Sequence, residues 1–444
     1  MIREIEDYVR SLDLDAYLVG GAVRDELLGL DSKDADFLVP AVDTESLRDA
    51  LAPHGRIEDL VVAGRLVGVR LHPRDRRVRE LAPSGIEFAP PRKEVSTGPG
   101  RHDFEIVADP SLSVEDDMRR RDFTVNAMAR RVADGRIVDP LDGRADLDRR
   151  LLRAVSEMSF AEDPLRLVRA LRFVSQLGFD LEETTRRQME EEAPAVALVS
   201  GERIGGGLAA DGMGELSKLL LGAEPAKALR LARDTGVLVA LIPAFGPAHD
   251  LTGHIFAVVQ ETADAGDDLA VRLAALFHDV GKAVDPDPLG HAQVSARIAR
   301  ETLDRLRYPS RLVRRVVAIV SEHPFRAEDS PKTGLDARRF LLAHGDGLAF
   351  DLVAHRRADL RAKSRDVSGV DELRALLEEE LSSPHRLRDL AVDGDDLVAV
   401  GFRPGPAVGR ALQMLLALVV DDPSLNTREA LLEHAKVEGW PESL

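Results

Sequence analysis

The residues best suited to chemistry in the first part of the chain lie within residues 18–39, LVGGAVRDELLGLDSKDADFLV. The pattern predicts a short strand, a tight turn and the start of a helix. Gly20 and Gly21 would form the turn, and because glycine has no Cβ, backbone N–H groups there can turn toward an anion. The positive end of the helix dipole would point to the same place, beside Arg24. These residues are therefore candidates for holding a phosphate group.

Two aspartates, Asp34 and Asp36, follow at the start of the next predicted strand. Residues two apart on a strand point to the same face, so both carboxylates would lie close together. A carboxylate pair beside a phosphate cradle is what Mg²⁺-dependent nucleotidyl transfer requires, because the ions bridge the carboxylates and the triphosphate. Glu87, on a later predicted strand, could add a third carboxylate or could simply face solvent. The structural alternative is an ordinary turn followed by solvated acids.

The string GGAVRDELLG followed by DAD resembles the head-domain signature of bacterial tRNA nucleotidyltransferases and poly(A) polymerases, the class II branch of the polymerase-beta-type superfamily. The resemblance extends along nearly the whole chain and implies an α+β fold, in which a head with a small mixed sheet precedes helical domains. The implied domains are a nucleotidyltransferase head at 1–150, a helical neck and body that selects the nucleotide and binds RNA at 151–245, an HD phosphohydrolase domain at 246–365 and a tRNA-binding helical tail at 366–444.

The composition is that of a globular protein. The chain has 444 residues, of which 44% are hydrophobic and 31% charged, which fits roughly two to four domains. No apolar run approaches the ~20 residues that cross a bilayer, and the N-terminus does not resemble a signal peptide. The chain contains no cysteine, so any metal site must use histidine and carboxylate ligands. These features predict a cytoplasmic protein without a membrane partner.

The net charge of −18 argues against a nonspecific nucleic-acid binder, whose affinity would come from broad phosphate neutralisation. It leaves room for a local basic groove, since arginines cluster at 74–79, 119–121 and 149–153, although each cluster could be a solvated face. Aromatic residues make up only 4%, so recognition of single strands by rows of stacked bases is not expected. An RNA partner would be recognised by shape and backbone.

Residues 92–113 are rich in glycine, proline and polar residues and predict a long mobile loop. In the relatives a flexible loop at this place takes part in switching from C to A addition. Its presence therefore favours an enzyme that adds the terminal A.

The next chemical stretch is RRRDFTVNAMARR. Arg119, Arg120 and Arg121 could neutralise a triphosphate or RNA phosphate, and Asn126 could bond a sugar hydroxyl. A basic helix face without function is the alternative. The string resembles the second motif of the family, RRRDFT-NA, which implies that these residues and Asp122 complete the nucleotide pocket.

The stretch SFAEDPLRLVRALRF begins the helical part of the chain. Pro164 suits a first helical turn, and Asp163 and Arg166, three residues apart, could form a local cap and ion pair. EDPLR also resembles the motif that presents a Watson–Crick-like edge to the incoming base, and the resemblance adds Arg169 to the nucleotide-binding residues. A carboxylate and a guanidinium at fixed spacing can accept C and A and leave G or U with unpaired groups.

The segments ERI at 202–204 and EL at 215–216 resemble a later family motif, ERI--EL-K-L. The sequence GGGLAADGMG separates them here, where the family has a couple of residues. Such a glycine-rich insert should break or bulge a helix.

A second set of residues, farther along the chain, could bind metal: His254, His278, Asp279, His291, His323 and Asp359. A lone histidine belongs more often to a core or a surface, but this set keeps its order around the string HDVGK. Imidazoles and carboxylates suit Mn²⁺, Ni²⁺, Fe²⁺ or Mg²⁺. The set resembles the HD phosphohydrolase domain found inside many of these enzymes, which implies a divalent transition metal, Mn²⁺ or Ni²⁺, and phosphoester hydrolysis as a second activity.

The resemblance implies attack by the 3′-hydroxyl of a tRNA on the α-phosphate of CTP or ATP, with Mg²⁺ held by Asp34 and Asp36 and pyrophosphate released. The C-terminal stretch is similar to the family tail that contacts the tRNA elbow, so the acceptor and T arms of tRNA are the expected partner. The alternatives are a poly(A) polymerase or an A-only adding enzyme on the same fold and, from another class, an HD phosphohydrolase whose head only binds RNA. The oligomeric state stays open.

Overall fold

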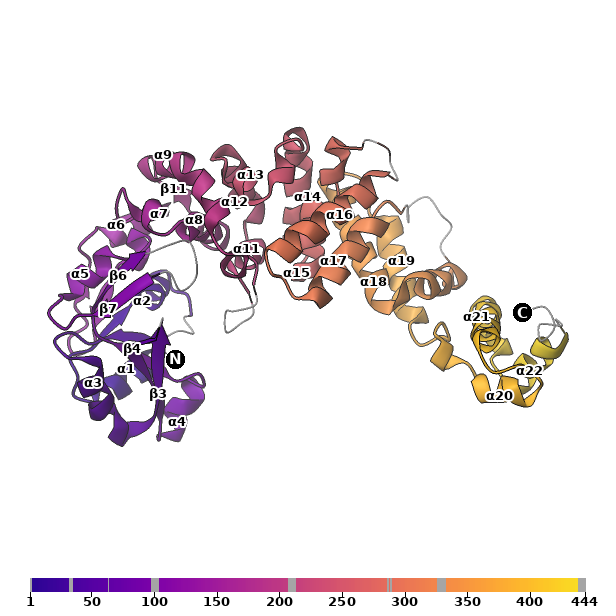
Figure 1. The fold of residues 1–444 in the computed structure, drawn as a ribbon, viewed down its shortest axis with the longest axis horizontal. Helices are drawn as coiled ribbons and strands as arrows, with labels where there is room; N and C mark the ends of the chain where they lie inside the picture. The colour runs from indigo at the N-terminus through magenta and orange to yellow at the C-terminus, as the bar shows by residue number, and fades with distance from the viewer. Residues whose placement is uncertain are drawn as a thin grey trace. The chain divides into compact units, whose positions relative to one another are not determined.

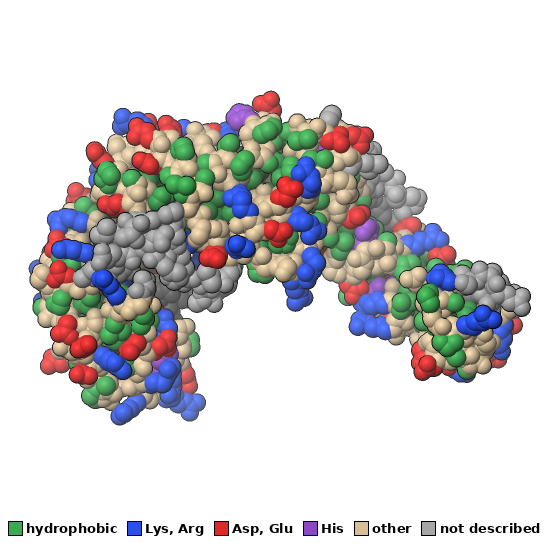
Figure 2. Space-filling model, viewed as in Figure 1, with side chains coloured by type: hydrophobic (Ala, Val, Ile, Leu, Met, Phe, Trp, Pro, Cys, Tyr) green, Lys and Arg blue, Asp and Glu red, His purple; other side chains and the backbone are tan. Residues whose placement is uncertain are grey.

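The computed structural model describes residues 2–31, 35–62, 64–96, 104–206, 213–285, 287, 290–325 and 333–437. The chain divides into two compact units (Figure 1), Met1–Gly246 with Arg305–Pro309 and Pro247–Asp304 with Ser310–Leu444. Acidic and basic side chains are interspersed on the face shown in Figure 2. Within the described part of the chain, no helix combines the length and apolarity that a membrane span requires.

The first unit contains a mixed sheet of seven strands in the order β3-β4-β5-β2-β1-β8-β9. The strands are β1 (Tyr17–Val19), β2 (Asp36–Leu38), β3 (Gly55–Val62), β4 (Arg65–Pro73), β5 (Ile86–Ala89), β8 (Ala129–Arg131) and β9 (Ile137–Val138). Strands β2 and β5 run parallel, and Asp36 lies opposite Glu87. Phe37 and Phe88, the next pair, stack with ring centroids 5.5 Å apart. This buried pair fixes the register and therefore sets the two acidic residues side by side.

The helices of this first region are α1 (Ile2–Arg10), α2 (Gly21–Leu27), α3 (Thr44–Leu51), α4 (Arg76–Leu81) and α5 (Val114–Arg119). The pattern at 61–71 predicts one strand, but these residues include the end of β3 and most of β4. The pattern at 77–82 also predicts a strand, which is wrong, since residues 77–81 belong to α4 and Ala82 caps it. The side chain of Asp75 accepts a hydrogen bond from the N–H of Val78 and caps that helix.

The predicted loop at 92–113 is also wrong in part. Strand β6 (Arg92–Ser96) pairs with strand β7 (Phe104–Ala108) as a separate antiparallel hairpin. The residues between the two strands lie outside the described part of the chain. Each residue of β6 pairs with a residue of β7 farther along the chain, and the composition of one stretch does not identify such a partner.

The helical part of the first unit surrounds α8 (Leu165–Leu177), which ends at Gly178 in the left-handed conformation. It is formed by α6 (Gly143–Asp148), α7 (Ser159–Glu162), α9 (Glu183–Glu192), α10 (Gly201–Ile204), α11 (Glu215–Leu220), α12 (Pro225–Asp234) and α13 (Val237–Leu241). The apolar spacing at 226–242 predicts one amphipathic helix, but Gly236, with φ 79°, separates α12 from α13.

The glycine-rich insert breaks the helix, as predicted, into α10 and α11. The described residues on both sides of the break meet again, because the N–H of Gly214 donates to the carbonyl of Gly205 at 3.0 Å. The Ser217 hydroxyl donates to the same carbonyl at 2.7 Å. The two halves of the motif are therefore joined as neighbours in space, although residues 207–212 lie outside the described part.

In the second unit, the structured residues are helical: α14 (Thr252–Asp264), α15 (Leu269–Phe277), η6 (Val280–Ala283), α16 (Gly290–Arg305), α17 (Ser310–Glu322), α18 (Gly334–Ala362) and α19 (Ser368–Glu380). Helix α18 packs against α14, α17 and α19. Farther along, α20 (Gly394–Ala399), α21 (Pro406–Asp421) and α22 (Arg428–Val437) share a hydrophobic cluster that includes Leu397, Leu415 and Leu431.

Candidate active site and metal centre

A cavity of about 770 Å³ opens in the first unit. Residues from all three nucleotide-binding motifs line it: Gly20, Gly21, Arg24, Asp36, Glu87, Arg120, Arg121, Asp122, Asn126, Asp163, Arg166 and Arg169. The fold thus brings the β1–α2 turn, the starts of two strands and helix α8 to one place.

The turn between β1 and α2 approaches an arginine closely. Gly20 has φ 72°, and a Cβ there would lie 2.7 Å from Nη1 of Arg121. The positive φ disfavours any residue with a Cβ there, and a Cβ would also displace the end of the Arg121 side chain. Arg24, on the first turns of α2, is 9% exposed and donates to Oδ1 of Asn126 at 2.6 Å. This hydrogen bond therefore holds Arg24, which follows the glycine turn, against the Asn126 amide of the second motif.

The carboxylates at the cavity come from neighbouring strands. Asp36 is exposed at the start of β2, and Glu87 lies opposite it in parallel register. Glu87 is already paired with Arg70, with 2.5 Å between Oε1 and Nη2. Asp34 lies outside the described residues, so the predicted geometry of the aspartate pair stays a prediction, as does a ligand role for Glu87.

The arginine triplet divides at the end of α5. Arg120 and Arg121 both pair with the buried Asp117, at 2.7 and 3.3 Å, and both line the cavity. Arg119 instead lies 3.7 Å from Asp116 with a side chain that is 56% exposed, and it is not among the lining residues. Successive residues at a helix end point in different directions, so the triplet does not act as one cluster.

Asp122 is the centre of a buried network. Nε of Arg169 donates to Oδ2 of Asp122 at 2.9 Å, and Nδ2 of Asn126 donates to Oδ1 at 3.0 Å. Burial alone would raise the pKa of Asp122, but the Arg169 charge and these hydrogen bonds hold it well below its usual range. The ionised Asp122 therefore fixes Asn126 of the second motif and Arg169 on α8, and both residues line the cavity.

Asp163 and Arg166 are held by different partners. Nη2 of Arg203 donates to Oδ2 of Asp163 at 2.8 Å. Arg166 donates to the Ser159 hydroxyl at 3.0 Å and to the Arg120 carbonyl at 2.9 Å. Among the described residues the local ion pair between Asp163 and Arg166 is not formed. Both side chains instead border the cavity at fixed positions.

The sequence analysis missed Arg172, Phe173 and Arg203, which also line the cavity. The Arg172 guanidinium lies over the Phe173 ring, 4.2 Å from its centroid, and pairs with Glu215 at 3.1 Å. Burial, with the nearby charge of Arg169, lowers the pKa of Arg172 to about 10. The three-residue spacing of arginines along α8 was the available signal. Arg203 and Glu215 flank the insert, so both halves of that motif reach the network.

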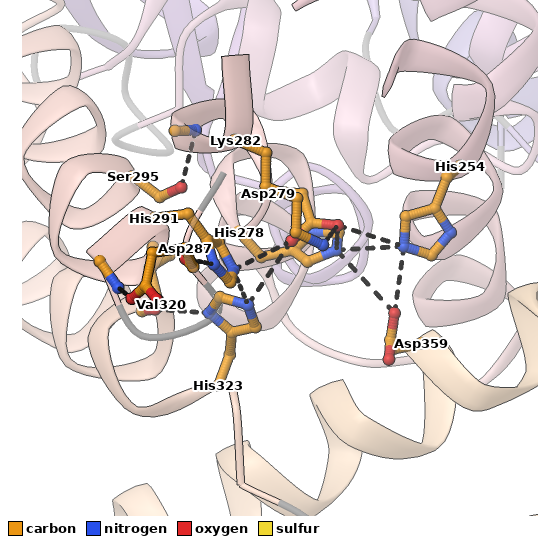
Figure 3. Close-up of polar contacts among 12 residues, drawn as sticks. His254, His278, Asp279, Lys282, Asp287, His291, Ser295, Val320, His323 and Asp359 are labelled. Carbon is orange, nitrogen blue, oxygen red and sulfur yellow. Dashed lines mark hydrogen bonds and ion pairs between the residues drawn. The ribbon is translucent and has the colours of Figure 1, made fainter. Parts of the chain in front are cut away.

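The predicted metal ligands of the second unit lie together (Figure 3). They form two groups, the first with His254, His278 and Asp359 and the second with Asp279, His291 and His323. Asp279 lies between the groups, since Oδ2 is 3.3 Å from Nε2 of His278 and Oδ1 is 3.4 Å from Nε2 of His291. All are buried except His254, whose side chain is 25% exposed.

Backbone carbonyls fix three of these imidazoles. Nδ1 of His278, His291 and His323 lies 2.8, 2.9 and 2.7 Å from the carbonyl oxygens of Ala275, Asp287 and Val320. Each Nδ1 must donate there, so each neutral ring presents a lone pair at Nε2. Burial lowers the pKa of His278 and of His291, which favours the neutral form. The Nε2 atoms of His291 and His323 lie 3.2 Å apart, an arrangement that a cation between them would stabilise.

His355 is a further histidine at this centre that the sequence analysis missed. It is 1% exposed, and its ring centroid lies 5.0 Å from that of His278 and 5.7 Å from that of His323. It therefore packs against one ligand of each group. Its position four residues before Asp359 places both on one face of α18, and that spacing was the available signal.

Family models match three segments of the chain. Residues 16–153 match the poly A polymerase head domain, residues 178–248 match the probable RNA and SrmB- binding site of polymerase A, and residues 251–376 match the HD domain. The head segment contains the cavity residues from Gly20 to Asn126 and the HD segment contains the metal centre, whereas the cavity residues on helix α8 lie between the first two matched segments.

Similar proteins cover two thirds of the chain or more. The multifunctional CCA protein of Thioalkalivibrio sulfidiphilus is 34% identical over 90% of this chain and 96% of its own, and that of Neisseria gonorrhoeae is 38% identical over 67% and 70%. The structure of the Bacillus stearothermophilus CCA-adding enzyme in complex with CTP matches with a TM-score of 0.69 and 26% identity over 98% of this chain and 96% of its own. These findings confirm the family and the fold class predicted from the motifs. The chain belongs to the multifunctional CCA proteins, a family of CCA-adding tRNA nucleotidyltransferases.

Proposed function

We propose that this protein adds the CCA end to tRNA from CTP and ATP and releases pyrophosphate. The observation that carries the proposal is the single cavity in which residues from three separate motifs meet. Solved relatives include CCA-adding enzymes in complex with CTP, with ATP and with tRNA. Since tRNA is the proposed substrate, we expect the reaction to take place in the cytoplasm.

The proposed roles follow the geometry of the cavity. The Gly20–Gly21 turn and Arg24 bind the triphosphate, with Arg120 and Arg121 beside them. Asp36, with Asp34, would hold Mg²⁺, and the exposed carboxylate of Asp36 opposite Glu87 suits a hard cation. Bound Mg²⁺ supplies charge stabilisation for the reacting phosphate. A nucleotide-binding role for Arg119 and a ligand role for Glu87 stay proposals that each need a separate variant.

Base selection is proposed for Asp163 and Arg166. Arg203 holds Asp163, and the Arg120 carbonyl holds Arg166. A base in the cavity would therefore meet a carboxylate and a guanidinium at set positions. The correct base pairs with both groups, whereas a wrong base leaves buried polar groups unpaired. We also propose that residues 151–245 and the tail at 366–444 bind the tRNA.

The decisive experiment removes the carboxylates. Asp34→Ala with Asp36→Ala should lower incorporation by on the order of a thousandfold, because several kcal/mol of stabilisation by the metal is lost. The assay supplies CTP alone, ATP alone or both, with tRNAs ending before C, CC or A. Wild-type incorporation of A alone would identify an A-only enzyme, and long A tails would identify a poly(A) polymerase. Survival of incorporation in the double variant would contradict the mechanism.

A second activity is favoured by the metal centre. We infer that the two groups of side chains would hold divalent cations, Mn²⁺ or Ni²⁺, which would supply Lewis-acid chemistry for phosphoester hydrolysis. These side chains suit a divalent cation, because the Nε2 lone pairs of His291 and His323 face one another and that of His291 faces the Asp279 carboxylate. His278→Ala should abolish Mn²⁺-dependent phosphate release and leave CCA addition unchanged. His291→Ala should lower the metal content from two ions per chain to one, measured by mass spectrometry.

A further inference from the structure

The ring of Phe173 contacts three guanidinium groups at the wall of the cavity. Cζ of Arg172 lies 4.2 Å from the ring centroid, Cζ of Arg24 lies 5.3 Å from it and Cζ of Arg169 lies 5.8 Å from it. All four residues line the cavity, and Phe173 is 4% exposed. A cation within about 6 Å of an aromatic centroid is attracted by the negative face of the ring. One uncharged side chain therefore interacts with three positive charges.

The three arginines come from two separate elements of the first unit. Arg24 lies on α2, directly after the glycine turn, whereas Arg169 and Arg172 lie on α8, whose first turn carries Arg166. A second aromatic contact fixes the ring, since Phe123 meets Phe173 edge-on with centroids 5.7 Å apart. The ring therefore joins the element proposed to bind the triphosphate to the element proposed to select the base.

Positive charge gathers at this wall of the cavity. Arginines outnumber acidic residues among the lining residues, although the whole chain carries a net charge of −18. Burial and the nearby charges of Arg169 and Arg24 lower the pKa of Arg172, because guanidinium groups so close together repel one another. An aromatic face offsets part of this repulsion, and it adds no negative charge that would oppose an incoming anion.

We propose that Phe173 is a positioning residue for the triphosphate of the incoming nucleotide. Its ring holds Arg24 against α8 and keeps Arg169 and Arg172 in place beside it. The positive charge of the three groups stays available to the triphosphate, because a ring does not neutralise it as a carboxylate would. The inference rests on the proposed nucleotidyl transfer and assigns a residue to one part of it, the binding of the triphosphate.

The test changes the charge distribution of the ring and leaves its size nearly the same. Replacement of Phe173 by monofluorophenylalanine and by trifluorophenylalanine withdraws electron density from the ring face in steps. Titration calorimetry of the full chain with Mg²⁺ measures the Kd for CTP and for ATP, which share the triphosphate. We expect both Kd values to rise with each step, by roughly fivefold to thirtyfold for the trifluorinated ring.

Two controls separate this role from a general loss of structure. Phe160 is buried and packs against the same Phe123 ring, with centroids 6.5 Å apart, and no guanidinium group of the described residues lies over it. Fluorinated rings at Phe160 should therefore leave the Kd for CTP unchanged. Incorporation of C relative to U and G should stay at the wild-type level in the Phe173 variants, because other residues hold the base-selecting pair.

Phe173→Leu gives an independent measurement, since it removes the ring and keeps an apolar side chain. It should raise KM for CTP and ATP alike and change kcat less, because the triphosphate is common to both nucleotides. A change confined to one nucleotide would contradict a role at the triphosphate.

Equal Kd values across the fluorinated series at Phe173 would overturn the proposal, and so would an equal rise in the series at Phe160. A loss of base discrimination together with affinity would also contradict it, because the ring would then support α8 as a whole. If the ring effect is found in binding but no nucleotide is incorporated into tRNA, the proposed transferase activity fails while the role of Phe173 stands. The binding measurements and the incorporation assay therefore test different statements.

Discussion

At the scale of single residues, Asp163 and Arg166 are held by groups that sequence spacing did not reveal. The distinctive order of EDPLR predicts a nucleotide-binding role for Asp163 and Arg166, and both side chains line the cavity. Their partners could not be predicted, since Arg203 lies beyond a long intervening stretch and reaches Asp163 only through the fold. Arg119 shows the reverse, because its neighbours in sequence line the cavity and it does not.

Arg203 should set the selectivity of the pocket. Arg203→Met removes a charged hydrogen bond worth about 1.5–3 kcal/mol, so Asp163 loses its fixed position. We expect kcat/KM for CTP to fall by roughly tenfold to a hundredfold and incorporation of U and G to rise relative to C and A. Single-nucleotide incorporation on tRNA substrates measures both. Arg186→Met, at the exposed pair with Glu190 on α9, is the matched control, and equal effects in both variants would contradict the role of Arg203.

Tyr308 gives the first unit a pH dependence. Its hydroxyl lies 3.0 Å from Oγ of Ser217 in a buried position, and burial raises its pKa above the ordinary value of 10.0. Above pH 10 the unfolded chain loses this proton and the folded chain keeps it, so the free energy of unfolding falls by about 1.4 kcal/mol per pH unit. Denaturant melts between pH 9 and about 11 should show the fall, and Tyr308→Phe should remove this contribution. The chain has 3 tyrosines, so absorbance at 295 nm can count those that ionise.

At the scale of elements, the local signals that succeeded were those that begin and end helices. Gly178 predicts the end of the helix that begins near Pro164, and α8 ends at this glycine. The failures have physical causes of two kinds. Single residues overrode a longer pattern, as when the Asp75 cap produced α4 and Gly236 divided a helix. Strand pairing, as in the β6–β7 hairpin, depends on partners that periodicity does not identify.

The junction beside the insert is an element-scale prediction. A Cβ on Gly214 would lie 2.3 Å from the carbonyl oxygen of Ile204, so Gly214→Ala must push α11 away from α10. We expect a loss of about 1–3 kcal/mol of unfolding free energy and a higher KM for both nucleotides, because Arg203 and Glu215 are moved apart. Gly409→Ala, on α21 with no atom near the added methyl group, should be neutral or slightly stabilising. A neutral Gly214→Ala would show that the junction is not tightly held.

At the scale of the whole molecule, each chemical site lies within one unit. Every residue that lines the cavity belongs to the first unit, and every candidate metal ligand among the described residues belongs to the second. The motifs had assigned these chemistries to separate stretches of sequence. The short segment Arg305–Pro309 also belongs to the first unit. Tyr308 contacts Ser217 and Arg305 contacts the Leu241 carbonyl. No sequence pattern indicated this, because these contacts exist only in the folded chain.

This separation predicts that metal removal destabilises one unit alone. A ligand at a hundred times its Kd stabilises the unit that binds it by about 2.7 kcal/mol, which corresponds to roughly 5–10 °C for a unit of this size. Calorimetry should therefore resolve two transitions, of which chelation of Mn²⁺ lowers one and addition of CTP raises the other. In His291→Ala the Mn²⁺-dependent shift should shrink while the CTP-dependent shift stays. A common shift of both transitions with either ligand would mean that the units unfold as one, since each ligand contacts only one of them.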